Sequence, residues 1–172
     1  MSTIVIVGAG PQLGFAIGAK FAEKGGFNVA LVARRESQLA AMVDRFRSAG
    51  VSAAAFVADV TDRPNLEKAL AAAEEHFGSI DVLEYSPAPT LSDLAERPLV
   101  SAVDLTVEAV LPELDTYFFG AVAAVRQVLP GMIDRGAGTI IGTSGAGSGR
   151  WSSRRSPTRT SRTLPCATGS SR

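Results

Sequence analysis

Cysteine is almost absent from this chain, with Cys166 alone among 172 residues. No disulfide can therefore form within it, and a metal site built from cysteines is excluded as well. We therefore predict no metal site. Long apolar runs are missing as well: the first, from Ile4 to Val7, ends at a glycine, whereas a membrane span needs about 20 apolar residues. We therefore expect no signal peptide, no membrane partner and a reducing, cytoplasmic location.

Net charge is also lacking, but the balance hides two unlike segments. Residues 1–149 carry 11 Lys and Arg against all 17 acidic residues, while residues 150–172 carry six arginines and no acid. Serine, threonine, arginine and proline dominate from residue 150 onward, and periodicity stops there. We predict one domain over residues 1–149 and a Ser/Arg-rich tail over residues 150–172. The tail should be disordered because like charges repel and it can bury little apolar surface.

What the domain does contain is a regular alternation of short β-branched runs and longer segments of helical period, which is typical of βαβ units. Runs such as IVIV and VALVA are apolar at successive positions, so both faces of the sheet should be covered. We predict an α/β fold with a doubly wound parallel sheet. The expected strands are Thr3–Val7, Asn28–Ala33, Ala53–Ala58, Val82–Tyr85 and Thr139–Thr143, and the expected helices are Leu13–Glu23, Glu36–Ser48, Pro64–Phe77 and a long one ending near Arg135.

The segment VGAGPQLGFAI follows the first strand and opens the first helix. Gly8 permits a tight turn, Gly10 allows the backbone to approach a phosphate, and Gly14 lets the helix pack against the strand. The helix N-terminus adds free amides and a positive dipole end. We predict a dinucleotide site of the Rossmann type here, with Gln12 and Leu13 completing the contacts, although an ordinary strand-to-helix turn is the alternative.

The end of the second strand indicates which dinucleotide is bound. NAD-binding proteins usually place an acid there for the ribose hydroxyls, whereas this chain has Ala33 followed by Arg34 and Arg35. A 2′-phosphate could form charge-assisted hydrogen bonds with these arginines. We therefore predict NADP rather than NAD as the cofactor, the alternative being that the two arginines are a solvated helix start.

Together, GAGPQLG, VALVARR, ADVTD, HFGSIDVLE and QVLPGMIDRGAGTII make residues 3–149 resemble the N-terminal two thirds of a short-chain dehydrogenase/reductase. In that family a G-x-x-x-G-x-G motif contacts the cofactor. Gly8 and Gly14 match its ends, while Gln12 replaces its middle glycine. The resemblance implies that Asp59, with Val60 beside it, binds the adenine; a turn-forming acid is the alternative for Asp59.

The departures from the family concern catalysis. Its Asn-Asn-Ala-Gly segment falls on YSPA, residues 85–88, and its catalytic asparagine falls on Tyr117. Its catalytic serine falls one place from Ser144. The family's Tyr-x-x-x-Lys pair is absent, since no lysine follows Lys68. Ser144 and Tyr117 are thus the remaining catalytic candidates, and we expect the chain to lack the proton donor that carbonyl reduction requires.

The tail resembles translation in a shifted frame, which would remove the helix bearing the Tyr/Lys pair and weaken a family-type homo-oligomer. Its arginines could neutralise phosphates, but Trp151 is the only aromatic residue among them, so we expect no nucleic-acid partner. Three functions remain open: an NADP-dependent oxidoreductase acting on a small carbonyl or alcohol, a non-catalytic NADP-binding protein, and a basic-tailed interaction protein.

Overall fold

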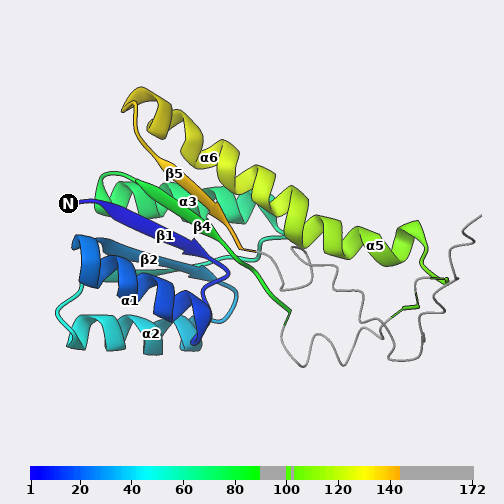
Figure 1. Ribbon diagram of the computed structural model, residues 1–172, viewed down its shortest axis with the longest axis horizontal. Helices are drawn as coiled ribbons and strands as arrows, with labels where there is room; N and C mark the ends of the chain where they lie inside the picture. The colour runs from blue at the N-terminus through cyan, green and yellow to red at the C-terminus, as the bar shows by residue number, and fades with distance from the viewer. Residues whose placement is uncertain (90–99, 102, 144–172) are drawn as a thin grey trace, which may run out of the picture.

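The computed structural model describes residues 1–89, 100–101 and 103–143, and Ser144 and the tail lie outside this part. The described chain forms a doubly wound α/β fold around one sheet of five parallel strands in the order β3-β2-β1-β4-β5 (Figure 1). This confirms the predicted fold class. The strands are β1 (Thr3–Val7), β2 (Asn28–Ala33), β3 (Ala53–Val57), β4 (Val82–Tyr85) and β5 (Thr139–Gly142).

Helices cover both faces of the sheet. On one face lie α1 (Leu13–Gly25) and α2 (Glu36–Ser48), and on the other lie α3 (Arg63–Phe77) and α6 (Gly120–Asp134) (Figure 1). All five residues of β1 are buried because successive side chains enter opposite layers. Ile4 and Ile6 belong to the core under α1 and α2, and Val5 and Val7 to the core under α3 and α6. The unbroken apolar runs of the sequence thus reflect two cores.

Local signals set most helix ends. Asp62 caps α3 by accepting a hydrogen bond from the Asn65 amide at 3.2 Å, as short polar side chains do at helix N-termini. Gly26 and Gly78 end α1 and α3 with φ values of 64° and 83°, which glycine adopts without steric cost. The predicted boundaries are correct within two residues: α1 runs two residues further, α3 begins one earlier, and β3 and β5 each end one earlier.

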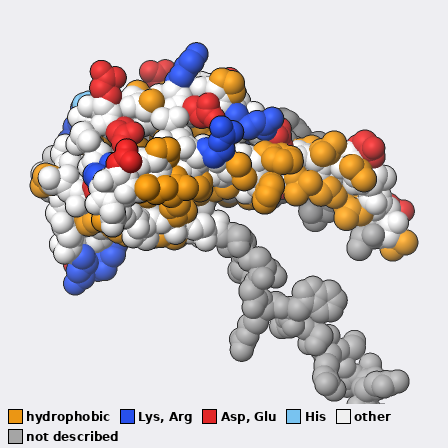
Figure 2. Space-filling view, turned by 90° about the horizontal axis from the view of Figure 1, so that it is seen from above, with side chains coloured by type: hydrophobic (Ala, Val, Ile, Leu, Met, Phe, Trp, Pro, Cys, Tyr) orange, Lys and Arg blue, Asp and Glu red, His pale blue; other side chains and the backbone are white. Residues whose placement is uncertain are grey.

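The long helix before β5 is interrupted. It comprises α5 (Val107–Leu114), a π-helical segment η1 (Asp115–Phe119) and α6. Its α5 end extends past the sheet (Figure 1). Figure 2 shows apolar side chains along the arm formed by α5, η1 and α6. Leu111, Phe118 and Phe119 are among the exposed ones. In the described part of the chain, no helix is long and apolar enough to cross a membrane.

Candidate functional site

A cavity of about 420 Å³ lies at the carboxyl ends of the strands. The sheet order runs outward from β1 through β2 on one side and through β4 on the other, so this edge contains the switch point at which open α/β sheets bind ligands. Four loops line the cavity. Their residues are Gly8, Gly10, Pro11, Gln12, Leu13, Gly14, Ala33, Arg34, Arg35, Gln38, Ala58, Val60, Ser86, Pro87, Ala88 and Pro89.

The three glycines between β1 and the first turn of α1 have different surroundings. Gly8 has a φ of 88°, and a Cβ there would overlap the backbone of Pro87. At Gly14 a Cβ would lie 3.0 Å from the Cα atom of Ala9, which reflects tight packing of α1 against the loop. A Cβ at Gly10 would meet no atom within 4 Å. The space at Gly10 therefore opens toward the cavity rather than into packed protein.

The N-terminus of α1 suits an anion. The helix begins at Leu13, its first turn holds no acidic residue, and Gln12 at the N-cap makes no side-chain capping bond. In this first turn the Phe15 amide donates to the Gly10 carbonyl and the Ala16 amide to the Gln12 carbonyl, both at 2.9 Å. The amides of Leu13 and Gly14 are the ones that can bind an anion, because the first amides of a helix have no acceptor within it, and the helix dipole places partial positive charge at this end. Together with the open space at Gly10, these features fit the diphosphate of a dinucleotide.

Two arginines and a glutamine line the cavity at the end of β2. Arg34 places its Nη1 atom 3.9 Å from Oδ2 of Asp59, and its side chain is half exposed. Arg35 is the N-cap of α2. Gln38, in the first turn of that helix, also lines the cavity; it is not among the residues predicted from the sequence, because no local pattern marks it. The cationic groups fit a phosphate ester at this end.

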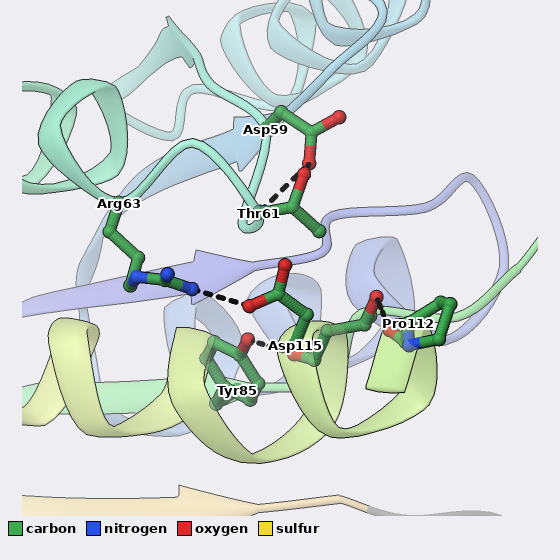
Figure 3. Close-up of polar contacts among 7 residues, drawn as sticks. Asp59, Thr61, Arg63, Tyr85, Pro112 and Asp115 are labelled. Atoms are coloured by element: carbon green, nitrogen blue, oxygen red, sulfur yellow. Dashed lines mark hydrogen bonds and ion pairs between the residues drawn. The ribbon is translucent and has the colours of Figure 1, made fainter. Parts of the chain in front are cut away.

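Asp59 stabilises the turn that follows β3. Its Oδ1 atom accepts hydrogen bonds from the amide and the hydroxyl of Thr61, at 2.9 and 2.7 Å, and so closes the turn before α3 (Figure 3). Its neighbours Ala58 and Val60 line the cavity, but Asp59 is not among the lining residues. The observed contacts match the alternative of a turn-forming acid, while the adenine contact stays a prediction.

Of the two catalytic candidates, the structure places only Tyr117, and Tyr117 does not line this cavity. Tyr117, on η1, borders a separate apolar cavity of about 370 Å³ together with Ile140 and Thr143, and Ser144 lies outside the described residues. Tyr85, the other tyrosine, donates its hydroxyl hydrogen to the Thr116 carbonyl (Figure 3). Burial, helped by the charge of Asp59, raises the pKa of Tyr85. Among the residues that the structure describes, neither tyrosine therefore lines the dinucleotide-like cavity.

No group of three or more His, Cys, Asp or Glu side chains within the described ranges could hold a metal ion.

The sequence matches the short chain dehydrogenase family over residues 2–155. The chain belongs to this family. Its glycine loop, arginine pair and five-stranded sheet all lie within the matched region.

Individual relatives agree with this membership. A putative ketoacyl reductase of Streptomyces coelicolor is 31% identical over 146 residues, covering 83% of this chain and 52% of the relative. An A-factor type gamma-butyrolactone 1′-reductase of Streptomyces virginiae is 31% identical over 148 residues, covering 83% and 53%. The chain thus spans about half the length of these curated relatives.

Solved structures with the same fold include two that contain NADPH. A variant of actinorhodin polyketide ketoreductase with NADPH has a TM-score of 0.73 at 28% identity, covering 85% of this chain and 54% of its own. L-Sorbose reductase from Gluconobacter frateurii, complexed with NADPH and L-sorbose, has a TM-score of 0.70 at 25% identity, covering 82% and 51%. The fold of the described residues is therefore that of reductase structures solved with this cofactor.

Proposed function

We propose that this chain carries the NADP-binding site of a short-chain oxidoreductase, which transfers hydride between the nicotinamide cofactor and a small carbonyl or alcohol. The observation that carries the proposal is the cavity itself. It joins a glycine loop with open space at Gly10 to a helix N-terminus and to Arg34 and Arg35. The two NADPH-containing neighbours support the choice of nicotinamide cofactor.

Each part of the cavity has a separate task. The first turn of α1 would hold the diphosphate through its amides, and Arg34 and Arg35 would hold the 2′-phosphate through charge-assisted hydrogen bonds. The cofactor, when bound, supplies the hydride. Gln38, from α2, adds an amide that can donate to a phosphate or accept from a ribose hydroxyl.

Cofactor choice tests the proposal. Titration of the 172-residue chain with NADPH and NADH, followed by nicotinamide fluorescence, should show tighter binding of NADPH. Arg34→Ala should remove most of that preference, because one charge-assisted contact is worth about 1.5–3 kcal/mol, or roughly tenfold or more in affinity. Arg126→Ala is the matched control, since Arg126 is an exposed residue of α6 that does not line the cavity. Equal affinity for the two dinucleotides would contradict the proposal.

A non-catalytic NADP-binding protein is a second candidate function. The observation that favours it is the state of the two tyrosines: Tyr85 is engaged with the Thr116 carbonyl, and Tyr117 lines a different cavity. Oxidation of bound NADPH by carbonyl compounds would exclude this candidate.

A further inference from the structure

Glu84 is a carboxyl group in the interior of the sheet. It lies on β4, in register with Ile6 of β1 and Ile141 of β5, and no part of it is exposed. An ionised carboxylate in such surroundings is unfavourable unless hydrogen bonds or opposite charges compensate for its lost hydration. Its hydrogen-bond partners and protonation state therefore matter.

These partners are few. The Oε2 atom of Glu84 accepts a hydrogen bond from Oγ of Ser86 at 2.8 Å, and Oε1 has no hydrogen-bond partner among the described residues. Burial raises the pKa of Glu84, while the hydroxyls of Ser86 and Thr143 lower it by less. Within the described ranges, no charged side chain contributes to this shift. The protonated form is thus favoured relative to an exposed glutamate.

Ser86 connects this carboxyl to the candidate cofactor site. It follows β4, its amide donates to the Val7 carbonyl at 2.9 Å, and it lines the cavity with the glycine loop. Residues two apart along an extended chain face the same side, so Glu84 lies directly behind Ser86. One hydrogen bond therefore separates the buried carboxyl from the space that a ligand would occupy.

The protonation state of Glu84 decides what Ser86 can offer to that space. When Glu84 is ionised, the Ser86 hydroxyl hydrogen is directed at Oε2, and only the lone pairs of Oγ are left for a ligand. When Glu84 is protonated, the carboxylic acid can donate to Oγ instead, which releases the Ser86 hydrogen for an acceptor in the cavity. Phosphate oxygens and the other oxygens of a dinucleotide are acceptors.

We propose that Glu84 and Ser86 form a proton-linked element of the dinucleotide site, in which Ser86 donates to an acceptor oxygen of the bound dinucleotide and Glu84 takes up a proton from water on binding. This inference rests on the proposed function. A nearby anion further disfavours the ionised carboxyl, so binding raises the pKa of Glu84. Affinity should therefore increase as pH falls from the bound-state pKa to the free-state pKa and level off below it.

The other groups in the cavity can be separated from this effect. Arg34 and Arg35 line it but stay charged throughout the accessible range. The 2′-phosphate of NADPH titrates at about pH 6. NADH lacks this group, so its binding reports the titration of the protein without that of the ligand's phosphate ester. NADPH serves as the second probe.

The test measures dissociation constants of NADH and NADPH for the 172-residue chain in half-unit steps from pH 5 to pH 8, with calorimetry in two buffers of different ionisation enthalpy to count protons. The wild-type protein should bind NADH roughly three- to tenfold more weakly at the top of this range than at its bottom and take up protons on binding. Glu84→Gln, which cannot ionise, should vary less than about twofold over the same range. Ser86→Ala should bind more weakly at pH 5 and lose the pH dependence.

Ser79→Ala is the matched control, because the Ser79 hydroxyl donates to Oδ2 of Asp81 at 3.2 Å, at the other end of β4. It should keep the wild-type pH profile. If Glu84→Gln fails to fold, as judged by thermal unfolding, Ser86→Ala still decides the question. A flat wild-type profile, or an unchanged slope in Glu84→Gln or Ser86→Ala, would overturn the proton linkage but leave the NADP site standing. Failure of the wild-type chain to bind either dinucleotide would overturn both.

Discussion

Gly8 and Gly10 lie two residues apart in one loop, yet their surroundings differ. Gly8 has a left-handed backbone conformation and packs against Pro87, whereas a side chain at Gly10 would project into open space within the cavity lining. A glycine required by the protein's own packing should matter for folding. A glycine beside open ligand space should matter for binding.

A pair of alanine variants separates these two roles. Gly8→Ala should lower the free energy of unfolding by about 2 kcal/mol or more, because it combines a strained φ with overlap on Pro87. Gly10→Ala should change stability by less than about 0.5 kcal/mol and weaken NADPH binding roughly tenfold or more, because its methyl group occupies phosphate space. Urea unfolding and NADPH titration measure the two effects. Normal NADPH affinity in Gly10→Ala would contradict a close approach of the dinucleotide to this loop.

Arg34 and Asp59 form an ion pair beside the cavity. Their closest charged atoms are 3.9 Å apart, and both side chains are more than one-third exposed. Ion pairs of this kind contribute about 0–1 kcal/mol, less than a charge-assisted bond from Arg34 to a phosphate. A bound 2′-phosphate can therefore compete with Asp59 for the guanidinium group.

At the scale of the elements, two side-chain contacts connect η1 to the rest of the fold, and Figure 3 shows them side by side. The buried Tyr85 hydroxyl donates to the Thr116 carbonyl, and Arg63 on α3 pairs with Asp115. Single π-helical turns inside α-helices leave backbone groups out of the regular pattern. The Tyr85 bond connects one carbonyl of η1 to β4 of the sheet.

The hydrogen bond and the ion pair should contribute differently to the free energy of unfolding. Tyr85→Phe should lower the free energy of unfolding by about 1–2 kcal/mol, because it removes a buried hydrogen bond and leaves the Thr116 carbonyl without this partner. Asp115→Asn should cost about 0–1 kcal/mol, since its ion pair with Arg63 is nearly half exposed. Urea unfolding with and without about 0.5 M NaCl gives both values. Salt should reduce only the Asp115 effect, and a larger loss from Asp115→Asn would reverse our ranking.

At the scale of the whole molecule, the cofactor side and the side that would hold the substrate differ in completeness. The cavity is lined by packed loops from four strand ends. By contrast, the arm formed by α5, η1 and α6 exposes apolar side chains (Figure 2), and Ile140 of β5 is 43% exposed. The described residues thus line the cavity that we propose for the dinucleotide and leave an apolar surface beside the second cavity.

We expect the 172-residue chain to bind NADPH without oxidising it. General acid catalysis contributes about 10²–10⁴ in rate, and the Tyr-x-x-x-Lys pair that would provide it is absent from this sequence. NADPH absorbance should therefore stay constant with diketones, quinones and aliphatic aldehydes. Gly14→Asp, which places a carboxylate against the anion site at the start of α1, is the control. Turnover that is lost in Gly14→Asp would show that another proton donor operates, and Tyr117→Phe would test the nearest candidate.

The sequence by itself determined the layered α/β fold, the strand and helix positions and half of the cavity lining. These features are local: a parallel strand covered on both faces is apolar at every position, as Thr3–Val7 nearly is, and glycines and arginines at strand ends are adjacent in sequence to the strands that place them. Gly8, Gly10, Gly14 and Arg34 could therefore be predicted as cavity residues.

Only the tertiary structure decided which distant residues meet. Gln38 and Ser86 join the cavity because α2 and the end of β4 converge on the glycine loop, and no local pattern encodes that distance. The burial of Glu84 depends on its neighbours Ile6 and Ile141, which lie 78 and 57 residues away along the chain. Asp59 turned toward Thr61 rather than into the cavity lining because the nearest hydrogen-bond donors lie in its own turn.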